Sequence, residues 1–363
     1  MPLKRIVFTV TNDLQYDQRM IRICTSLTNA GYQVLLIGNR NNVSLPLANK
    51  IYKQKRLFTF FKAGFGFYAE YNVRLFFTLL FTKTDLLCCI DLDTMLPVWL
   101  VSKMKGTKRV YDAHEFFSQQ KEIITRPFVH KFWLGIEKFF VPKFKLGYAV
   151  SQSIVIEFKT RYGVQYEVIR NLPVLKDLPA GNIAKEKIIL YQGAVNEARG
   201  FEYLIPAMKN IDAILHIYGD GNYLQQTKNL IEANNLHHKV FLKGKVLPHE
   251  LDAITRQATI AVNLVENNGL NQYFSLANKF FDYIQNGIPQ VSMNFPEYKR
   301  INDEFEVAVL IANLEPGTIS AALNKLLQNE VLYRQLAKNC IQARQVFNWQ
   351  EEEKKLLNFY NAI

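Results

Sequence analysis

An alternation of short apolar runs and helical stretches, which occurs twice along the chain, is the feature that most constrains the fold. In the first half, segments with helical periodicity separate apolar runs at residues 4–10, 33–38, 85–90, 108–113 and 146–150. Runs that are apolar on both faces and separated by helices are typical of a parallel β-sheet covered on both sides. The alternation restarts after a break in composition. The pattern therefore predicts an α/β chain of two doubly wound domains facing across a cleft, with ligands bound beyond the carboxyl ends of the strands.

The break in composition lies in the stretch NLPVLKDLPAGNIAKEK, which holds two prolines, a glycine and mixed charge, as linkers do. We expect a Rossmann-like N-terminal domain at residues 1–173, a linker at 174–187, a Rossmann-like C-terminal domain at 188–346 and a C-terminal helix at 347–363. The first strand leads into TNDLQYDQR instead of a GxGxxG motif, so a conventional NAD-binding domain is not expected.

The net charge differs between the two halves of the chain. Residues 1–175 contain 25 Lys and Arg against 12 Asp and Glu, a net charge of +13, whereas the rest contains 19 against 20. The first half is therefore expected to face an anionic partner. Zinc-ligand spacings, a basic recognition helix and RNP-like strings do not occur, so nucleic acid is not expected. An anionic membrane surface or a phosphate-bearing acceptor fits the charge better.

The segment from Leu57 to Phe81, LFTFFKAGFGFYAEYNVRLFFTLLF, is the nearest approach to a membrane-spanning run. Lys62, Glu70 and Arg74 interrupt it, and the chain has no run of about 18 apolar residues, so we expect no transmembrane helix. Its aromatic and basic composition is typical of a segment that lies in a membrane interface, and a core helix with a loop explains it equally well. The absence of a signal peptide pattern and of a CxxC spacing predicts a reduced, cytoplasmic protein at the inner face of the membrane.

The stretch SLANKFFDYIQNGIP predicts a mostly buried helix with a narrow polar stripe. Gly287 and Pro289 are typical of its end. At 3.6 residues per turn, one stripe roughly 100° wide carries Ser275, Asn278, Lys279, Asp282 and Asn286. A stripe that contacts only water is one explanation of this pattern, and a ligand site is the other.

The residue types on this stripe fit a nucleoside diphosphate. A helix N-terminus with Ser, Asn and Lys in its first turns favours phosphate, through free N–H groups, the helix dipole and one cation. Asp282, one turn further, can accept hydrogen bonds from the diol of a ribose. Phosphate at the start of the helix and sugar one turn in is therefore the working hypothesis.

Three loops that follow strands of the second half are expected at the same edge. GAVNEARG, residues 193–200, offers the fork-shaped cation of Arg199 to phosphate oxygens. YGDGN, residues 218–222, and KGK, residues 243–245, are the other two. An exposed arginine and ordinary turn residues are the alternative explanations.

In the first half, the motif YDAHE follows the strand at residues 108–113. It places His114 and Glu115 at the edge of the sheet, where a histidine between carboxylates can donate to or deprotonate a hydroxyl. A structural histidine is the alternative. Asp17 and Arg19, which follow the first strand, are expected at the same rim.

The string DLD at residues 91–93 has two interpretations. A DxD after a strand is a motif that binds Mn²⁺ or Mg²⁺ beside a diphosphate in another class of transferases. Alternatively, Asp93 and Thr94 provide the N-cap of a helix over MLPVWLVSKM. The cations Arg199 and Lys279 already supply the charge that a metal would bring, so no metal is expected.

Taken in order, these motifs resemble those of the retaining GT-B glycosyltransferases of family 4, especially bacterial members that build surface glycans. The resemblance covers nearly the whole chain and rests on VTNDLQYDQR, DLDTMLP, YDAHE, RNLPV, QGAVNEARG, YGDGN and SLANKFFDYIQNGIP. It implies a nucleotide-sugar donor bound by the C-terminal domain, an acceptor bound by the N-terminal domain and no metal. It also implies a C-terminal helix that crosses back to the first domain.

Carried onto this chain, the resemblance implies that Arg199 and Lys279 hold the diphosphate, Asp282 holds the ribose and His114 faces the transferred sugar or the acceptor. The catalytic candidates are therefore His114, Arg199 and Lys279. The donor-binding candidates are Gly193, Arg199, Gly219, Lys243, Gly244, Ser275, Asn278, Lys279 and Asp282. The candidates for contacts with the sugar or the acceptor are Asp17, Arg19, Glu115, Glu266 and Asn271.

The chain departs from the family pattern at two places. Many members carry two glutamates eight positions apart, where this chain has Phe274 and Asp282. Sugar contacts are therefore expected from Glu266 or Asn271 instead. Many members also carry an arginine directly after the loop glycine, where this chain has Ala194, so the diphosphate has one cation fewer.

We therefore expect a glycosyltransferase that moves a sugar, with retention, from a nucleoside-diphosphate-sugar to a hydroxyl of a glycan or lipid-linked acceptor. Bacterial polysaccharide or lipopolysaccharide-type biosynthesis is the expected setting, with no cofactor. Two alternatives stay open: a sugar-nucleotide epimerase or hydrolase of the same fold, and a non-catalytic partner that binds nucleotide sugars.

Overall fold

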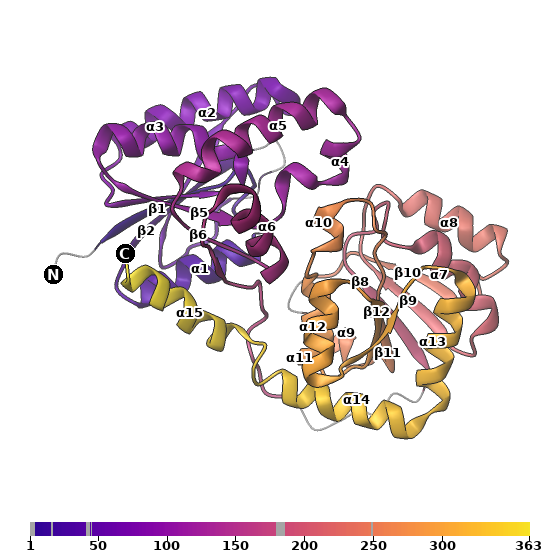
Figure 1. The fold of residues 1–363 in the computed structure, drawn as a ribbon. Coiled ribbons are helices and arrows are strands. Elements are labelled where there is room, and N and C mark those ends of the chain that lie inside the picture. The colour runs from indigo at the N-terminus through magenta and orange to yellow at the C-terminus, as the bar shows by residue number, and fades with distance from the viewer. Residues whose placement is uncertain (1–3, 16, 41–43, 45, 179–185, 248–249) are drawn as a thin grey trace. The chain divides into compact units, whose positions relative to one another are not determined.

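The computed structural model describes residues 4–15, 17–40, 44, 46–178, 186–247 and 250–363, and the chain divides into two compact units (Figure 1). Unit 1 consists of Met1–Asn171 together with Glu352–Ile363, and unit 2 consists of Leu172–Glu351. The segment expected as a linker falls within unit 2 in this division, and its residues 179–185 lie outside the described residues.

The described strands of unit 1 form one parallel sheet in the order β3-β2-β1-β4-β5-β6-β7. Their bounds are β1 Arg5–Thr9, β2 Gln33–Arg40, β3 Lys53–Phe58, β4 Leu86–Ile90, β5 Lys108–Ala113, β6 Leu146–Ala149 and β7 Glu167–Val168. Strands β2 and β3 lie on one side of β1 and strands β4 to β7 lie on the other, so the strand order reverses between β1 and β4. Open parallel sheets bind ligands at such a reversal, beyond the carboxyl ends of the strands.

Helices cover both faces of the unit 1 sheet (Figure 1). One face carries α2 Gly64–Phe81, α3 Met95–Lys105 and α5 Pro127–Phe140, and the other carries α1 Gln18–Asn29, α6 Gln152–Tyr162 and α15 Trp349–Asn361. Short elements complete the unit: η1 Leu92–Thr94, η2 Phe117–Gln119, α4 Lys121–Ile124 and η3 Val141–Lys143. The end of α15 packs into this unit, because Tyr360 is 1% exposed and its hydroxyl lies 3.1 Å from that of Tyr148.

The described strands of unit 2 form a second parallel sheet in the order β10-β9-β8-β11-β12-β13. Their bounds are β8 Ile188–Gln192, β9 Ile214–Tyr218, β10 Val240–Gly244, β11 Ile260–Asn263, β12 Gln290–Met293 and β13 Ala308–Ile311. The helices are α7 Phe201–Ala207, η4 Met208–Asn210, α8 Leu224–Ala233, α9 Leu251–Thr255, α10 Leu270–Tyr273, α11 Asn278–Gln285, α12 Pro296–Phe305, α13 Pro316–Gln328 and α14 Glu330–Ala343.

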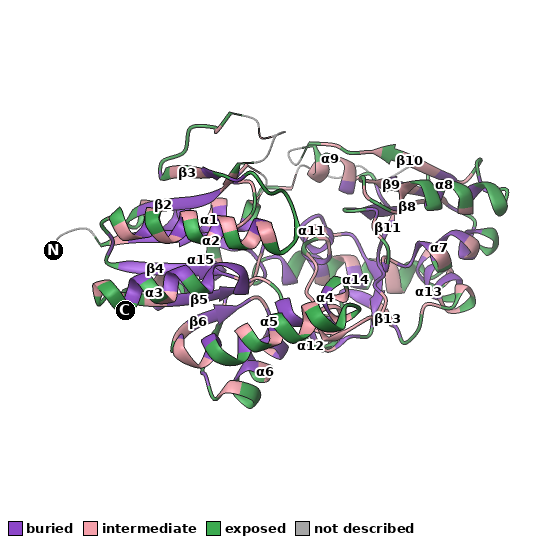
Figure 2. Ribbon diagram, turned by 90° about the horizontal axis from the view of Figure 1, so that it is seen from above, coloured by how far each residue is buried: buried purple, intermediate pink, exposed green. Residues whose placement is uncertain are grey.

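The cores of both units lie between their sheets and helices, and the central strands β4 and β11 are buried along their whole length (Figure 2). All four cysteines are buried and free of disulfides. Within the residues that the structure places, no helix combines the length and apolarity that crossing a bilayer requires. Two parallel sheets with interleaved helices confirm the predicted pair of doubly wound domains.

One predicted segment divides differently from the expectation. The aromatic and basic stretch from Leu57 to Phe81 is the end of strand β3, a loop and helix α2. Strand β3 was not expected, because its sequence KQKRLF lacks an apolar alternation. It lies at the edge of the sheet, where Lys and Arg side chains protect an unpaired strand from further pairing.

Candidate functional site

Loops that follow neighbouring strands of unit 2 are tied together at the carboxyl edge of its sheet. The backbone N–H of Gly193 donates to the carbonyl of Tyr218 at 3.0 Å, and that of Gly219 donates to the carbonyl of Gly244 at 2.8 Å. A Cβ on Gly219 would lie 1.8 Å from the carbonyl oxygen of Gly193, so only glycine allows this approach. The structure thus brings three predicted glycines to one edge.

A pocket of about 420 Å³ opens between these loops. Gly193, Gly219, Asp220 and Lys245 are among the residues that line it. Lys243, which was expected at the site, does not line this pocket: its Nζ lies 5.3 Å from the centroid of the Phe241 ring. The cation of the KGK loop that reaches the pocket is Lys245.

Helix α11 supplies the side chain with the most unusual environment in unit 2. The Nζ atom of Lys279 is buried, makes no hydrogen bond with the residues that the structure describes and lies 3.6 Å from the centroid of the Tyr191 ring. It also borders Gly193, since a Cβ on that glycine would lie 3.5 Å from Nζ. Burial lowers the pKa of Lys279 well below its ordinary value, and the nearby Arg199 lowers it further, against the opposing effect of Asp282.

Arg199 lies on the loop after β8, close enough to Lys279 to affect its pKa. It is half-buried, and no ion pair or hydrogen bond joins its side chain to any residue that the structure describes. The preceding residue, Ala198, has φ 65°, a left-handed conformation that costs a non-glycine residue about 1–2 kcal/mol. Its carbonyl accepts the N–H of Glu266 at 3.1 Å. Two cations without a hydrogen-bonded carboxylate therefore lie close together, an arrangement suited to an anion.

Asp282 lies on the same helix, one turn after Lys279. Its Oδ2 accepts a hydrogen bond from Nε2 of Gln192 at 3.1 Å, and Oε1 of Gln192 accepts one from the Thr255 hydroxyl at 2.7 Å. These two hydrogen bonds fix the Asp282 carboxylate at the end of β8. Neither Tyr191 nor Gln192 was expected at the site, although both stand at the polar end of the apolar run KIILYQ.

The start of α11 differs from the expectation. The helix begins at Asn278, so Ser275 precedes it instead of occupying its first turn. The hydroxyl of Tyr298 accepts the backbone N–H of Ala277 at 3.1 Å and lies 3.5 Å from the Ser275 hydroxyl. Asn278 is exposed in the first turn. Asn286, at the end of the helix, is buried and accepts a hydrogen bond from Arg256.

The two residues expected to replace the missing glutamate lie on the segment between β11 and α11. The Oε2 of Glu266 accepts a hydrogen bond from Asn268 at 2.5 Å, and its backbone contact with Ala198 holds it beside the Arg199 loop. Asn271 is on the short helix α10 and is partly exposed.

In unit 1, a charged cluster lies at the carboxyl ends of β4 and β5. Arg19 is 3% exposed and donates to Oδ1 of Asp112 and to the Ile169 carbonyl, both at 2.9 Å. Oδ2, the other carboxylate oxygen of Asp112, lies 3.1 Å from Nε2 of His114. Arg19 therefore lies beneath the cluster, not at its rim, and it orients Asp112. Asp17 accepts the N–H of Met20 and caps helix α1.

The ion pairs set the protonation of this cluster. Burial raises the pKa of Asp112, but Arg19 and His114 outweigh burial, so the pKa lies below its usual value. Burial lowers the pKa of His114, but the Asp112 carboxylate raises it above the ordinary value. The pair therefore favours a carboxylate beside an imidazole that is protonated more readily than in water.

Asp91 and Asp93 have separate structural partners. Oδ1 of Asp91 accepts the N–H groups of His114 at 2.9 Å and Glu115 at 3.3 Å, which holds the YDAHE loop against β4. Asp93 accepts a hydrogen bond from the Thr11 hydroxyl at 2.6 Å, and burial raises the pKa of Asp93 to about 6.

The N-cap interpretation of the DLD string is wrong for Thr94, which makes no side-chain cap to α3. Thr94 occupies the position before α3 without a side-chain cap, because its hydroxyl bonds to the carbonyls of Thr9 and Ile90. Across the described ranges, no group of three or more His, Cys, Asp or Glu side chains is placed to hold a metal ion. Glu115 is exposed and accepts a hydrogen bond from Gln120.

Comparison with known proteins finds a family match within unit 2. Residues 176–344 match the model of the family Glycosyl transferases group 1. The matched segment contains Arg199, Lys279, Asp282 and the glycine loops. Among curated proteins, none matches the chain by sequence.

Solved structures resemble the whole chain and not only residues 176–344. Sucrose-phosphate synthase from Thermosynechococcus elongatus is 16% identical with a TM-score of 0.83, over 99% of this chain and 98% of that one. HepE of Anabaena, in complex with UDP and glucose, is 12% identical with a TM-score of 0.77, over 99% of each chain. WaaG, a glycosyltransferase involved in lipopolysaccharide biosynthesis, is 12% identical with a TM-score of 0.75, over 97% of this chain and 98% of that one. The chain thus has the GT-B fold that its sequence predicts.

Proposed function

We propose that the protein transfers a sugar from a nucleoside-diphosphate-sugar to an acceptor hydroxyl. The observation that carries the proposal is the pair Lys279 and Arg199, which lies within the segment that matches the family Glycosyl transferases group 1. Nζ of Lys279 is buried without a hydrogen bond to any described residue, and Arg199 is close enough to lower the pKa of Lys279. A diphosphate beside them would supply the missing negative charge. The free protein is thus preorganised for an anion that it does not itself contain.

The same pair suits the chemistry of the transfer. Negative charge develops on the diphosphate as its bond to the sugar breaks, and fixed cations at that position stabilise the transition state by several kcal/mol. Asp282, held by Gln192, would accept the ribose hydroxyls one helical turn away. The pocket beside Gly193 and Gly219 would take the rest of the nucleotide. UDP is the first nucleotide to test, because HepE binds it on the same fold.

On the acceptor side, His114 is the candidate for handling the hydroxyl proton. With Nε2 directed to Asp112, a neutral imidazole leaves Nδ1 as the proton acceptor. We propose retention of configuration, no metal requirement and a glycan or lipid-linked acceptor, all supported by the motif order of the chain. The excess positive charge of residues 1–175 supports a site of action at an anionic membrane surface, on the cytoplasmic side.

The test is calorimetric binding of UDP, GDP and ADP to the wild type and to Arg199→Ala. We expect Arg199→Ala to weaken binding of the preferred nucleotide by about 10- to 150-fold, because a charge-assisted hydrogen bond contributes about 1.5–3 kcal/mol. Lys228→Ala is the matched control, since Lys228 is an exposed cation on α8 of the same domain. Equal affinity of Arg199→Ala and the wild type would refute the diphosphate site.

A second measurement separates transfer from hydrolysis. The nucleotide released from the preferred nucleotide sugar is measured with and without a membrane extract as the source of acceptor. A transferase releases nucleotide only when acceptor is present. Equal release in its absence would instead indicate a hydrolase.

A further inference from the structure

Three neighbouring helices of unit 1 expose apolar side chains on their outer faces. Phe81 on α2 is 82% exposed and Phe128 on α5 is 90% exposed. Exposed apolar side chains also occur at Phe65, Val73, Phe77, Leu96, Leu100 and Met104. Helices α2, α3 and α5 lie side by side on one face of the sheet (Figure 1). An exposed apolar surface shared by three helices marks an interaction site.

Helix α2 shows how unusual this surface is. Its buried stripe consists of Phe67, Tyr71, Leu75 and Leu79, which is the ordinary core face of a surface helix. The opposite stripe should be polar, but it repeats apolar residues at every fourth position: Phe65, Ala69, Val73, Phe77 and Phe81. The helix is therefore apolar on two opposite faces, although only one of them faces the core.

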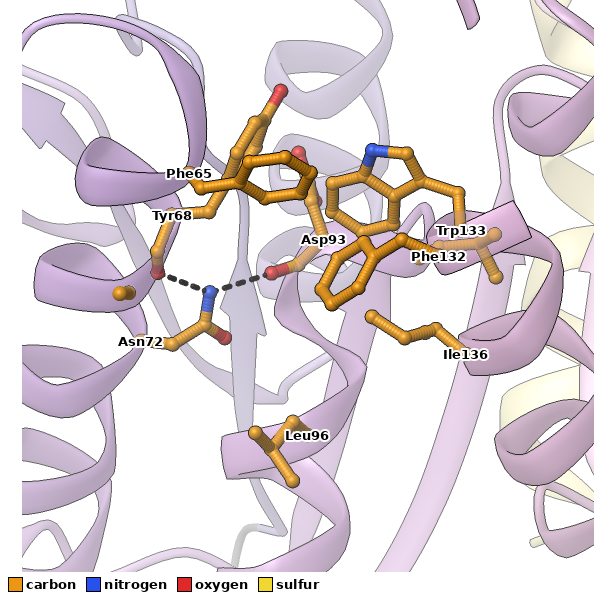
Figure 3. A pocket seen from close by; sticks show the side chains of 10 residues that line it. Phe65, Tyr68, Asn72, Asp93, Leu96, Phe132, Trp133 and Ile136 are labelled. Atoms are coloured by element: carbon orange, nitrogen blue, oxygen red, sulfur yellow. Dashed lines mark hydrogen bonds between the residues drawn. The ribbon is translucent and has the colours of Figure 1, made fainter. Parts of the chain in front are cut away.

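A pocket of about 530 Å³ opens among α2, the start of α3 and α5 (Figure 3). This volume lies within the range of roughly 300–1,000 Å³ that is typical of ligand pockets. Its walls are mostly rings and aliphatic groups, among them Phe65, Tyr68, Phe132, Trp133 and Ile136. The rings of Phe65 and Phe132 are both about half exposed and pack edge to face, with their centroids 4.9 Å apart. This contact joins α2 to α5.

The pocket offers few polar groups to a ligand. The side-chain amide of Asn72 donates to the backbone carbonyls of Tyr68 at 2.7 Å and Asp93 at 2.9 Å, so its donor is already used (Figure 3). Asp93 is the residue with a carboxyl group among the lining residues. It lies at the end of β4, beside the His114 cluster. A ligand that fills this pocket must therefore be apolar over most of its length, with any polar end near Asp93.

The charges around the apolar surface select its occupant. Lys131 and Lys138 are exposed on α5 in the same stripe as Phe128, Phe132 and Phe139. Rings and lysines that alternate on one helix face are typical of a helix that rests in an anionic membrane interface. A second copy of the chain on this surface would bring like charges together, because a two-fold interface repeats the same patch on both sides.

We propose that this pocket holds one hydrocarbon chain of an anionic membrane lipid, while the exposed stripes of α2, α3 and α5 rest in the membrane interface. The contact with the membrane interface rests on the site of action in the proposed function, whereas the lipid pocket goes beyond it, because lipid binding here does not require sugar transfer.

The first experiment uses a soluble probe, a terminally brominated undecanoic acid below its micelle concentration. Trp133 lines the pocket, so it reports the bromine by quenching when Trp99→Phe and Trp349→Phe remove the other two tryptophans. We expect the probe to lower the fluorescence of Trp133 at least twofold, and the effect to saturate as the probe concentration rises. Sodium bromide at the same concentration measures contact with solvent alone. Quenching that does not saturate, or that sodium bromide reproduces, overturns the proposal.

A matched pair of substitutions locates the chain. Ala69→Phe adds a ring on the pocket wall, and Val73→Phe adds one on the same stripe outside the pocket. We expect Ala69→Phe to weaken probe binding at least fivefold and Val73→Phe to leave it unchanged. Equal binding by both variants would place the probe elsewhere and overturn the proposal.

The second experiment uses the otherwise unmodified chain, with vesicles of phosphatidylglycerol and phosphatidylcholine. We expect binding that increases with the phosphatidylglycerol content, and weaker binding after Phe128→Ser, which removes an exposed ring without touching the core. Failure to bind these vesicles, together with a dimer in sedimentation, would assign the surface to a second copy. UDP binding by the wild type and by Ala69→Phe is measured alongside. A wild type that does not bind UDP but still binds the probe would refute the proposed function and leave the lipid site standing.

Discussion

Replacement of Lys279 by methionine should stabilise the free protein and weaken its binding to a nucleoside diphosphate. Nζ of Lys279 is buried and has no hydrogen-bond partner in the described part of the chain. Burial lowers the pKa of Lys279 well below its ordinary value, which shows that the folded protein disfavours the charged form. Methionine has a similar length and fills the same space without a charge.

The expected magnitude follows from two opposing contributions. Burial of an unpaired cation costs several kcal/mol even after relaxation, and the face of the Tyr191 ring, 3.6 Å away, returns about 2 kcal/mol. Lys279→Met should therefore raise the free energy of unfolding of unit 2 by about 1–3 kcal/mol. Loss of one charge-assisted hydrogen bond to phosphate, about 1.5–3 kcal/mol, should raise the Kd for UDP roughly 10- to 150-fold.

The lowered pKa also fixes the sign of the pH dependence. Because the folded state holds the Lys279 proton less tightly than the unfolded state, stability rises as the pH rises from the folded-state pKa towards the ordinary value of 10.5. Lys279→Met removes this rise. UDP brings negative charge and raises the pKa, so binding should take up protons.

The assay has two parts. Urea unfolding is followed by Trp349, the tryptophan of unit 2, with Trp99 and Trp133 replaced by phenylalanine. UDP binding is measured by calorimetry in two buffers of different ionisation enthalpy, with Lys228→Met as the control. A Lys279→Met protein that is less stable than the wild type, or that binds UDP within threefold of it, would refute this reasoning.

Three further predictions rest on single observations. Ala198→Gly should stabilise the protein by about 1 kcal/mol in thermal unfolding, because Ala198 has φ 65°; a destabilised variant would show that the loop is not strained. Asp93→Asn should remove a fall in stability between about pH 4 and pH 6, worth up to about 3 kcal/mol. Burial raises the pKa of Asp93 to about 6, so the folded state retains a proton there that the unfolded state loses, and an unchanged urea-against-pH profile would contradict this. Asp282→Ala should weaken UDP binding in calorimetry roughly tenfold and should weaken binding of 2′,3′-dideoxy-UDP much less, since the ribose diol is its expected partner; equal losses for both nucleotides would reject that role.

The sequence predicted the strands that are continuous apolar runs, and the meeting of Arg199 and Lys279, because both depend on local patterns. A strand buried on both faces is a continuous apolar run, and the run at residues 108–113 has the bounds of β5. Parallel strands bring the loops that follow them to one edge, so residues 80 positions apart could be placed together.

Features that depend on distant partners could not be predicted in this way. Arg19 is buried because its partner Asp112 lies 93 positions away, so its pattern on α1 resembles that of a rim residue. Strand β3 exists because β2 pairs with it, although its own sequence is polar. The Tyr191 ring next to Lys279 is likewise a contact between a strand and a helix that only the folded chain forms.

A crystal structure of the protein with UDP tests the central claim most directly. We predict a phosphate oxygen within about 3 Å of Nζ of Lys279, the distance of a charge-assisted hydrogen bond, with the Arg199 guanidinium on the same diphosphate. A diphosphate bound away from both side chains would contradict the account.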